Sequence, residues 1–489
     1  MHHSPDEPSK ATCPAGKNNE NKTDDSNNES DKAGHETGPD MMDIKSTHPE
    51  EVSGGIFSGE NGKDYCNMSR WDTLFALITN QLGLGILSLP ACLKVLGLIP
   101  GIVTILCVAL VTRYTGMELH QFYCRHHYVI NVVEMVKIVG GRSWGIVAGI
   151  GLLIQVMMTC ASAAVTLSIA FNTLSNHGTC TVGFIGIGCL GCWVLCMPRT
   201  VKFVSRSGIP CFVSIIAAAL IVMISLGVKE PSQAPEGWKV KIELFGNPSF
   251  REVFNACLRV IYAFAGNHTF VSYMAEMRDP IRDFPFALGW LVSISTVLYS
   301  ILAITIYCLA GEYTTSPALG SAPLIPAKIA YGIIIPAIFT TGLANGHVGI
   351  KYIYIEVMRW IKATDEVTQN TKKSWTVWAT CVTAYWIICF ILSNAIPIFD
   401  SILSISSATT YAWFTYGVSA VLWFSLNKGS MFDGWKKICL FCLNSFLILF
   451  SLFLNGGGLW SSITELLDTF ADDSTTVQGS FSCGDNALF

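Results

Sequence analysis

The stretch from Asn80 to Pro90 reads Asn-Gln-Leu-Gly-Leu-Gly-Ile-Leu-Ser-Leu-Pro, and it constrains this chain more than any other feature. It lies in an apolar run long enough to cross a lipid bilayer, yet it contains two glycines and two side-chain amides. Glycine is a poor helix former and amides are costly in hydrocarbon, so these residues are not expected in a simple lipid-facing anchor. A membrane helix can be interrupted only where its freed backbone groups are buried in protein or line a cavity. The stretch therefore predicts a binding site made of backbone N–H and C=O groups near mid-membrane, which is typical of a transporter.

The composition predicts an all-α polytopic membrane protein. Of the 489 residues, 51% are hydrophobic and only 13% are charged, and the mean hydropathy is +0.46. Soluble proteins carry about 25% charged residues, whereas repeated apolar runs of about 18 residues or more are long enough to span a bilayer as helices. The excess of Lys and Arg in the apolar part falls mostly in short loops, where it indicates orientation rather than nucleic-acid binding.

The chain is predicted to have three parts. Residues 1–70 are polar and too poor in apolar side chains to form a core, which predicts a disordered cytoplasmic tail. Residues 71–458 form a transmembrane domain, and residues 459–489 form an extracellular tail. The eleven predicted transmembrane helices are 71–89, 95–119, 144–171, 181–198, 208–228, 253–275, 285–310, 329–351, 375–396, 398–426 and 437–458.

The basic residues also predict the orientation of these spans. With the N-terminus in the cytoplasm, most loop Lys and Arg residues lie on the inner side, as the positive-inside rule requires, and the C-terminus lies outside. The 18 cysteines show no metal-ligand spacing, so no metal site or cofactor is predicted. Cys180 and Cys483 would both face outside, where a disulfide between them is one alternative and two free thiols the other.

A second interrupted span is predicted around Gly266 and Asn267, in the middle of span six. Spans one and six occupy corresponding positions if spans 1–5 and 6–10 are inverted halves. Glycine-broken segments at matching positions in two halves are the best sequence indication of a transporter's binding site. The halves share no visible side-chain pattern, so this repeat is inferred from position alone.

The two interruptions suit an amino acid, which brings one carboxylate and one ammonium group into the site. The N–H groups of residues 84–86, which open the second half of span one, would meet the carboxylate at the positive end of a helix dipole. Carbonyl groups near Asn80 and in residues 263–265 would accept hydrogen bonds from the ammonium. The alternative is that Gly83 and Gly85 only let helices pack closely.

Two other spans present polar faces toward the bundle. In span three the polar residues recur at i, i+4, i+7 and i+11, which places on one face Gln155, Thr159, Ser162 and Thr166. Span eight carries Thr341 and Asn345 one turn apart. Interhelical hydrogen bonding is the alternative role for the side chains of span three. The full set of predicted substrate-binding residues is Asn80, Gln81, Gly83, Leu84, Gly85, Ile86, Gln155, Thr159, Ala263, Phe264, Gly266, Asn267, Thr341 and Asn345.

Three ionisable residues in or just after span six are candidates for coupling or gating. His268 is the proton-coupling candidate, because an imidazole beside a membrane cavity can take up and release protons; a neutral histidine hydrogen-bonded in the core is the alternative. Glu276 and Arg278, at the inner end of the span, are candidates for a salt-bridged gate, with a solvated loop as the alternative.

Several of these residues resemble a known family. The segment from Thr79 to Pro90 resembles the Gly-x-Gly-Ile-Leu-x-Leu-Pro start of the amino acid/auxin permease family, and so do three further segments, namely Tyr114-Thr-Gly116, Lys202 with Ser205, and Ala265-Gly266 with Glu276-Met-Arg-Asp-Pro280. The hydrophilic head and span six look most like the neutral amino acid permeases of filamentous fungi, the Mtr type. The resemblance covers about residues 70–458.

The family resemblance implies a LeuT-like (APC-type) five-plus-five inverted repeat with one extra helix, and symport of amino acids with protons or sodium. The Mtr-type resemblance implies import of neutral aliphatic and aromatic amino acids, driven by protons, across a fungal plasma membrane. Sodium-coupled relatives place an Asn four residues before the first glycine of the motif, where this chain has Thr79. This departure favours protons over sodium as the coupling ion.

We therefore predict a secondary active transporter rather than an enzyme, whose partners are an amino acid, a proton and the lipid bilayer. A membrane enzyme would need a cluster of catalytic side chains at one depth, and His268 has no obvious partner in the sequence. Two alternatives keep the same fold: a vacuolar or vesicular exporter, and a sensor that binds amino acids without transporting them.

Overall fold

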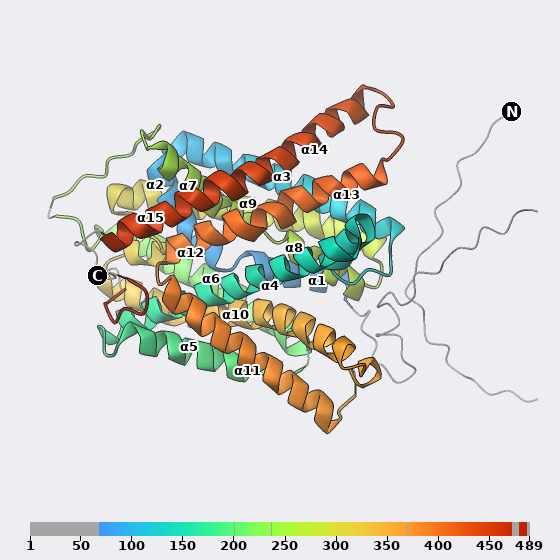
Figure 1. Ribbon diagram of the computed structural model, residues 1–489. Helices are drawn as coiled ribbons and strands as arrows, with labels where there is room; N and C mark the ends of the chain where they lie inside the picture. Colours follow the sequence, from blue (N-terminus) through green and yellow to red (C-terminus); the bar gives the residue numbers. More distant parts are fainter. Residues whose placement is uncertain (1–67, 200, 236, 368, 472–478, 487–489) are drawn as a thin grey trace, which may run out of the picture.

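The computed structural model describes residues 68–199, 201–235, 237–367, 369–471 and 479–486, and this part of the chain is helical throughout (Figure 1). Its only β-type pairing is an isolated bridge between Met68 and Met277. Within these described ranges, seven helices are long and apolar enough to cross a membrane, or eight if one bent pair counts as a single span. The predicted all-helical class is confirmed, and these helices support a polytopic membrane protein. The predicted disordered tail, residues 1–70, lies almost entirely outside the described residues.

The α-helices, in chain order, are α1 (Arg70–Gln81), α2 (Leu89–Leu96), α3 (Leu98–Arg125), α4 (Val132–Ser175), α5 (Thr181–Cys196), α6 (Val201–Val228), α7 (Phe250–Phe264), α8 (Asn267–Glu276), α9 (Pro280–Ala310), α10 (Leu324–Trp360), α11 (Lys372–Ala395), α12 (Phe399–Ser406), α13 (Val418–Leu426), α14 (Trp435–Phe453) and α15 (Leu459–Ala471). A 3₁₀ segment, η2 (Leu84–Ser88), precedes α2. Two π-helical segments, η6 (Ser407–Tyr411) and η7 (Trp413–Gly417), connect α12 to α13, and a third, η8 (Leu454–Gly458), connects α14 to α15.

Both predicted interruptions are present. The helix α1 ends at Gln81, and after Gly83 the chain resumes as η2 and α2, bent by 44° from α1. The helix α7 ends at Phe264, and α8 begins at Asn267 after a two-residue break. Each break exposes helix-end N–H and C=O groups inside the bundle, because the residues on both sides are buried.

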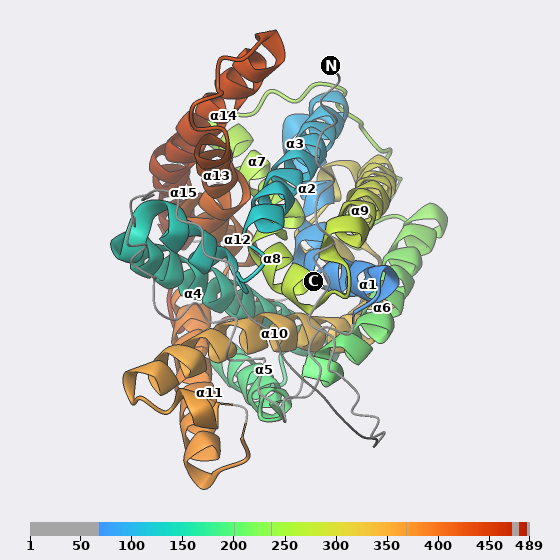
Figure 2. The ribbon, with the colours of Figure 1, turned by 90° about the vertical axis from the view of Figure 1, so that its right-hand side faces the viewer.

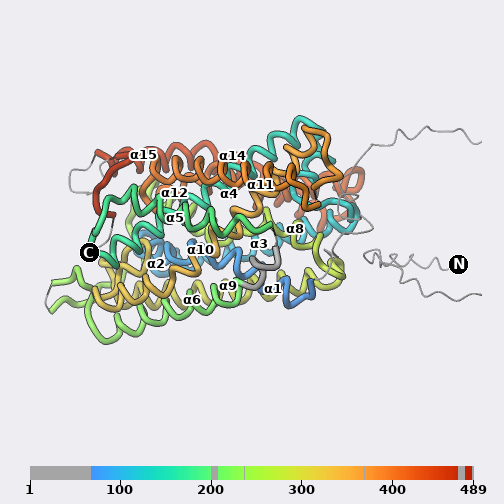
Figure 3. The backbone as a smooth tube through the Cα atoms, turned by 90° about the horizontal axis from the view of Figure 1, so that it is seen from below, coloured from blue at the N-terminus to red at the C-terminus, as the bar shows by residue number. Residues whose placement is uncertain are grey.

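The interrupted helices lie among longer ones. Figure 2 shows α8 near the middle of the bundle and α11 and α14 at its edge, and Figure 3 shows α1 and α15 toward opposite ends. The helix α10 packs against α4 and α6, and α9 packs against α1, α2 and α3. The α4 helix bends near its start, where Gly141 has a φ of 77°, a conformation that favours glycine.

The last helical segment runs further than the sequence predicts. Span eleven was expected to end at residue 458, but the helix continues through η8 into α15 as far as Ala471. From the sequence alone, the acidic residues after position 458 indicate a solvated tail. In the structure two of them are paired: Glu465 with Arg259, and Asp468 with Arg251. These ion pairs allow the helix to continue against α7.

A disulfide joins Cys180, just before α5, to Cys483 near the end of the chain. The residues around Cys483 also bond to neighbouring helices. Thr181 Oγ1 donates to the Gly484 carbonyl at 2.6 Å, and Asn486 Nδ2 donates to the buried Ser168 Oγ of α4 at 2.8 Å. At the end of α11, Ser480 Oγ donates to the Ala395 carbonyl at 2.8 Å, so residues 479–486 contact α4, α5 and α11. Of the two alternatives, a disulfide or two free thiols, the structure contains the disulfide.

We expect peptide mass mapping to detect this link. In denatured, unreduced protein, maleimide should modify the free thiols of Cys439 and Cys442 but not Cys180 or Cys483. After reduction all four should react, because disulfides persist in oxidising compartments and only free thiols react with maleimide. Full modification of Cys483 before reduction would contradict the link.

Candidate functional site

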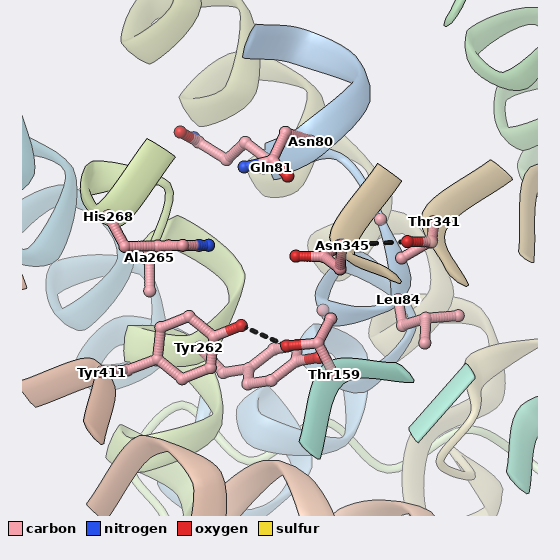
Figure 4. A pocket seen from close by; sticks show the side chains of 12 residues that line it. Asn80, Gln81, Leu84, Thr159, Tyr262, Ala265, His268, Thr341, Asn345 and Tyr411 are labelled. Atoms are coloured by element: carbon pink, nitrogen blue, oxygen red, sulfur yellow. Dashed lines mark hydrogen bonds between the residues drawn. The ribbon is translucent and has the colours of Figure 1, made fainter. Parts of the chain in front are cut away.

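The two helix breaks meet at a small cavity (Figure 4). Its free volume is about 20 Å³, which is room for about one water molecule. The lining residues come from both breaks and from α4, α10 and η6, and they are Asn80, Gln81, Gly83, Leu84, Gly85, Thr159, Tyr262, Ala265, His268, Thr341, Asn345 and Tyr411. Figure 4 shows Asn80 and Gln81 at one end and the two tyrosines with Thr159 at the other. Spans one, six, three and eight thus all contribute to the lining, together with η6 of span ten.

The predicted residues divide into two groups. Those that line the cavity are Asn80, Gln81, Gly83, Leu84, Gly85, Thr159, Thr341, Asn345 and the coupling candidate His268. Those that the cavity does not include are Ile86, Gln155, Ala263, Phe264, Gly266 and Asn267. Asn267 turns the other way, since its Nδ2 donates to Thr115 Oγ1 of α3 at 2.8 Å. Ile86 and Phe264 are fully buried in the surrounding apolar core.

Two tyrosines form one end of the cavity. The Tyr411 hydroxyl lies 2.6 Å from Thr159 Oγ1, and the Tyr262 hydroxyl lies 3.4 Å from Ser162 Oγ. Their rings are 5.0 Å apart in an edge-to-face arrangement. Neither tyrosine is among the substrate-binding residues predicted from the sequence.

A signal for Tyr411 exists in the sequence. Polar residues of span ten recur at i, i+4, i+7 and i+11, namely Asp400, Ser404, Ser407 and Tyr411. This is the same spacing that places the polar residues of span three on one face, and it would have placed Tyr411 on an inward-facing stripe. All four side chains are buried or nearly so.

The glycines allow the two interrupted helices to touch. A Cβ at Gly85 would lie 2.6 Å from Ala263 Cα, which is closer than real Cβ contacts come. A Cβ at Gly83 would lie 3.2 Å from Thr341 Cγ2. The close-packing role that the sequence left as an alternative is therefore present, and it operates at the cavity wall itself.

Polar side chains also connect the breaks. Asn80 Nδ2 donates to Thr269 Oγ1 at 2.9 Å, and Thr269 donates to the Gly266 carbonyl at 2.9 Å. Tyr299 of α9 reaches a carbonyl at each break, that of Gln81 and that of Ala263. The Ala263 carbonyl, predicted to face a substrate, is therefore already hydrogen-bonded.

The lining carries no Asp, Glu, Lys or Arg among the described residues. Its only imidazole is that of His268, which is 3% exposed and points into the cavity beside Tyr411 (Figure 4). Neither ring nitrogen has a hydrogen-bond partner of normal geometry in the described part of the chain. The site therefore offers hydrogen bonds and helix-end dipoles rather than fixed charge.

Ion pairs lie toward both ends of the bundle. Arg259, one turn before Tyr262, is 3.0 Å from Asp400 and 2.9 Å from Glu465, and its side chain is only 8% exposed. Beside this cluster lies a second cavity of about 360 Å³, lined by Lys94, Arg259 and Asp400 among others. Asp400, near the start of span ten, therefore faces an open space.

At the opposite end, Glu276 pairs with Lys351 of α10 at 4.0 Å rather than with Arg278. Arg278 contributes through its backbone, whose N–H donates to the Met68 carbonyl at 3.2 Å. The predicted gate candidates are thus in contact with neighbouring elements, but not with each other by an ion pair in the described residues.

Comparison with known proteins shows that this chain is similar to fungal transport proteins. The chain is 28% identical over 444 residues to the N amino acid transport system protein of Neurospora crassa, covering 88% of this chain and 93% of that protein. It is 25% identical over 439 residues to a transmembrane transporter of Fusarium pseudograminearum, covering 88% and 90%. These names indicate a transporter rather than an enzyme.

The family match covers nearly all of the helical region. Residues 67–464 match the family described as transmembrane amino acid transporter protein. This range begins just before α1 and ends within α15, so it includes both helix breaks and every residue that lines the cavity. The resemblance found in the sequence motifs is confirmed, and the chain belongs to the transmembrane amino acid transporter family.

Proposed function

We propose that this protein is a secondary active transporter that imports neutral amino acids with protons across the plasma membrane. The observation that carries the proposal is the uncharged cavity at the meeting point of two interrupted helices. A zwitterion with a neutral side chain needs one group of hydrogen-bond donors, one group of acceptors and an apolar surface, but no counter-charge.

Each requirement has a candidate in the lining. N–H groups at the start of η2, near Leu84 and Gly85, would meet the carboxylate, because a helix N-terminus carries partial positive charge. The ammonium would bond to carbonyls at the end of α1, near Asn80, and to the amide oxygen of Asn345. Tyr262 and Tyr411 would contact the side chain, which favours aliphatic and aromatic substrates.

The cavity is too small for an amino acid, so transport requires the surrounding elements to move. The free volume of about 20 Å³ describes a closed state. We infer that substrate enters when the two tyrosines or the helix halves separate, as in alternating access around a site between two repeats. This motion would break the hydrogen bond between Tyr411 and Thr159.

We also propose eleven membrane crossings, with an inverted five-plus-five arrangement and one extra helix. Two observations support this arrangement. The breaks lie between α1 and α2 and between α7 and α8, which correspond to predicted spans one and six, and α14 with α15 follows the span formed by α12 and α13. A cytoplasmic N-terminus and an external C-terminus agree with the disulfide at Cys483, since disulfides form in oxidising compartments.

His268 is the proposed proton-coupling residue, and protons are preferred over sodium. Replacing His268 with Ala should flatten the pH dependence of uptake, because the described lining holds no other side chain that can take up a proton and become charged. Uptake measured from pH 5 to pH 8 in vesicles checks this expectation. As a control, His177, which lies near Asp485 away from the cavity, should be replaceable by Ala without changing the profile. An unchanged profile in the His268 variant would leave this histidine a packing residue.

The proposed activity is tested by uptake of labelled leucine, phenylalanine, lysine and GABA into vesicles, with and without a pH gradient. Accumulation of leucine and phenylalanine, but not lysine, only with the acidic side outside would support proton-driven import. Substrate binding without uptake would indicate a sensor. Localising a tagged chain to the vacuole instead of the plasma membrane would indicate an exporter.

A further inference from the structure

One tyrosine hydroxyl lies between the two helix breaks. Tyr299 of α9 is fully buried, and its hydroxyl oxygen is 3.0 Å from the Gln81 carbonyl oxygen and 2.8 Å from that of Ala263. The first carbonyl belongs to the last residue of α1, and the second lies next to the last residue of α7. Both interrupted helices therefore direct carbonyl groups of their C-terminal turns toward a single O–H group.

Two helix C-termini that converge need a positively polarised partner. Each helix end carries a partial negative charge, and its last carbonyls lack partners within the helix. Away from water, a carbonyl without a partner costs free energy. In transporters with broken helices, such carbonyl groups are a common site for a bound cation such as sodium. Here the partner is a phenol, which provides one shared proton and no net charge.

The ring fixes the hydroxyl in this position. The Tyr299 ring lies edge-to-face against Phe264, with centroids 5.0 Å apart, and Phe264 is the residue at which α7 ends. Both side chains are fully buried. The hydroxyl is thus held by packing from one of the helices whose carbonyl it binds.

We propose that the Tyr299 hydroxyl takes the place of a coupling cation between the two breaks, and so makes transport independent of sodium. The proposal rests on the proposed transport function. It assigns Tyr299 as a positioning residue, which holds the ends of α1 and α7 together while the substrate binds on the other side of the breaks. It also gives a structural reason, separate from the residue at position 79, for preferring protons as the coupling ion.

Two variants test the proposal, with a matched control. Tyr299→Phe keeps the ring and removes the proton, so uptake should fall at least tenfold at normal surface expression. Tyr331→Phe is the control: Tyr331 is equally buried, but its hydroxyl has no hydrogen-bond partner in the described residues, so uptake should be unchanged. Tyr299→Ser removes the aromatic ring, and so leaves space beside the Gln81 and Ala263 carbonyls.

Sodium dependence is the readout that a merely structural role would not alter. Wild-type uptake should be the same in sodium chloride and in choline chloride at a fixed pH gradient. Tyr299→Ser should be several-fold more active in sodium chloride than in choline chloride. The melting temperature of purified Tyr299→Ser in detergent should also rise with sodium, whereas that of the wild type should not.

The outcomes separate this inference from the proposed function. Wild-type uptake that requires sodium, a Tyr299→Phe variant as active as wild type, or a Tyr299→Ser variant whose melting temperature ignores sodium would each overturn the inference. If the wild type transports no amino acid, the proposed function fails, but the melting measurements still decide whether this position can hold a cation.

Discussion

Replacing Gly85 with Val will abolish amino acid uptake while the protein still reaches the membrane. The first added carbon alone would lie 2.6 Å from Ala263 Cα and 3.1 Å from Tyr262 Cδ1. The two interrupted helices would have to separate, because one of these contacts is to backbone that cannot rotate away. We expect at least a hundredfold loss of uptake, measured with labelled leucine and normalised to surface protein.

The matched control for this prediction is Gly332→Val in α10. Gly332 is exposed, and a Cβ there would meet only Leu174 at 3.9 Å, an ordinary contact. The same substitution should therefore leave uptake near the wild-type level. Normal transport by the Gly85 variant would mean that the contact between the two breaks is not needed, and the proposed site would have to be abandoned.

Replacing Arg259 with Leu should both destabilise the protein and stop transport. The guanidinium bridges Asp400 of α12 and Glu465 of α15, and its loss leaves two carboxylates close together without a cation. Removing one partner of a buried ion pair costs about 3–5 kcal/mol. We expect the lower end of this range, because the Glu465 side chain is 34% exposed. Melting in detergent and uptake by vesicles are the measurements.

Arg251 provides the comparison for Arg259. It also lies on α7 and pairs with an acidic residue of α15, but both Arg251 and Asp468 are exposed at 40% and 59%. Surface ion pairs contribute only about 0–1 kcal/mol, so Arg251→Leu should melt close to wild type. Equal melting temperatures for the two variants would show that the Arg259 cluster is not a structural link.

The sequence was most informative where backbone chemistry alone decides the structure. Glycines and amides inside an apolar run cannot form an ordinary lipid-facing helix, so both helix breaks could be predicted without knowing any neighbour. The same reasoning placed Asn80, Thr159 and Asn345 near one cavity, because each lies at a break or on a polar stripe.

Other features depend on partners that are distant in the sequence. Asn267 sits at a predicted break, but Thr115 draws its side chain to the opposite side. Glu465 looks like part of a solvated tail until Arg259 is found beside it. Tyr299 has no distinguishing sequence context, and its importance appears only when two carbonyl groups 182 residues apart in the chain converge on it.

The anchored C-terminal segment affects how the protein can be labelled. Asn486 bonds to Ser168 and Asn172 inside the bundle, so a fluorescent protein fused after residue 489 would begin only three residues from a buried contact. By the proposed topology, the chromophore of such a fusion would also have to mature outside the cell. Reporters for microscopy and purification are better attached ahead of residue 1.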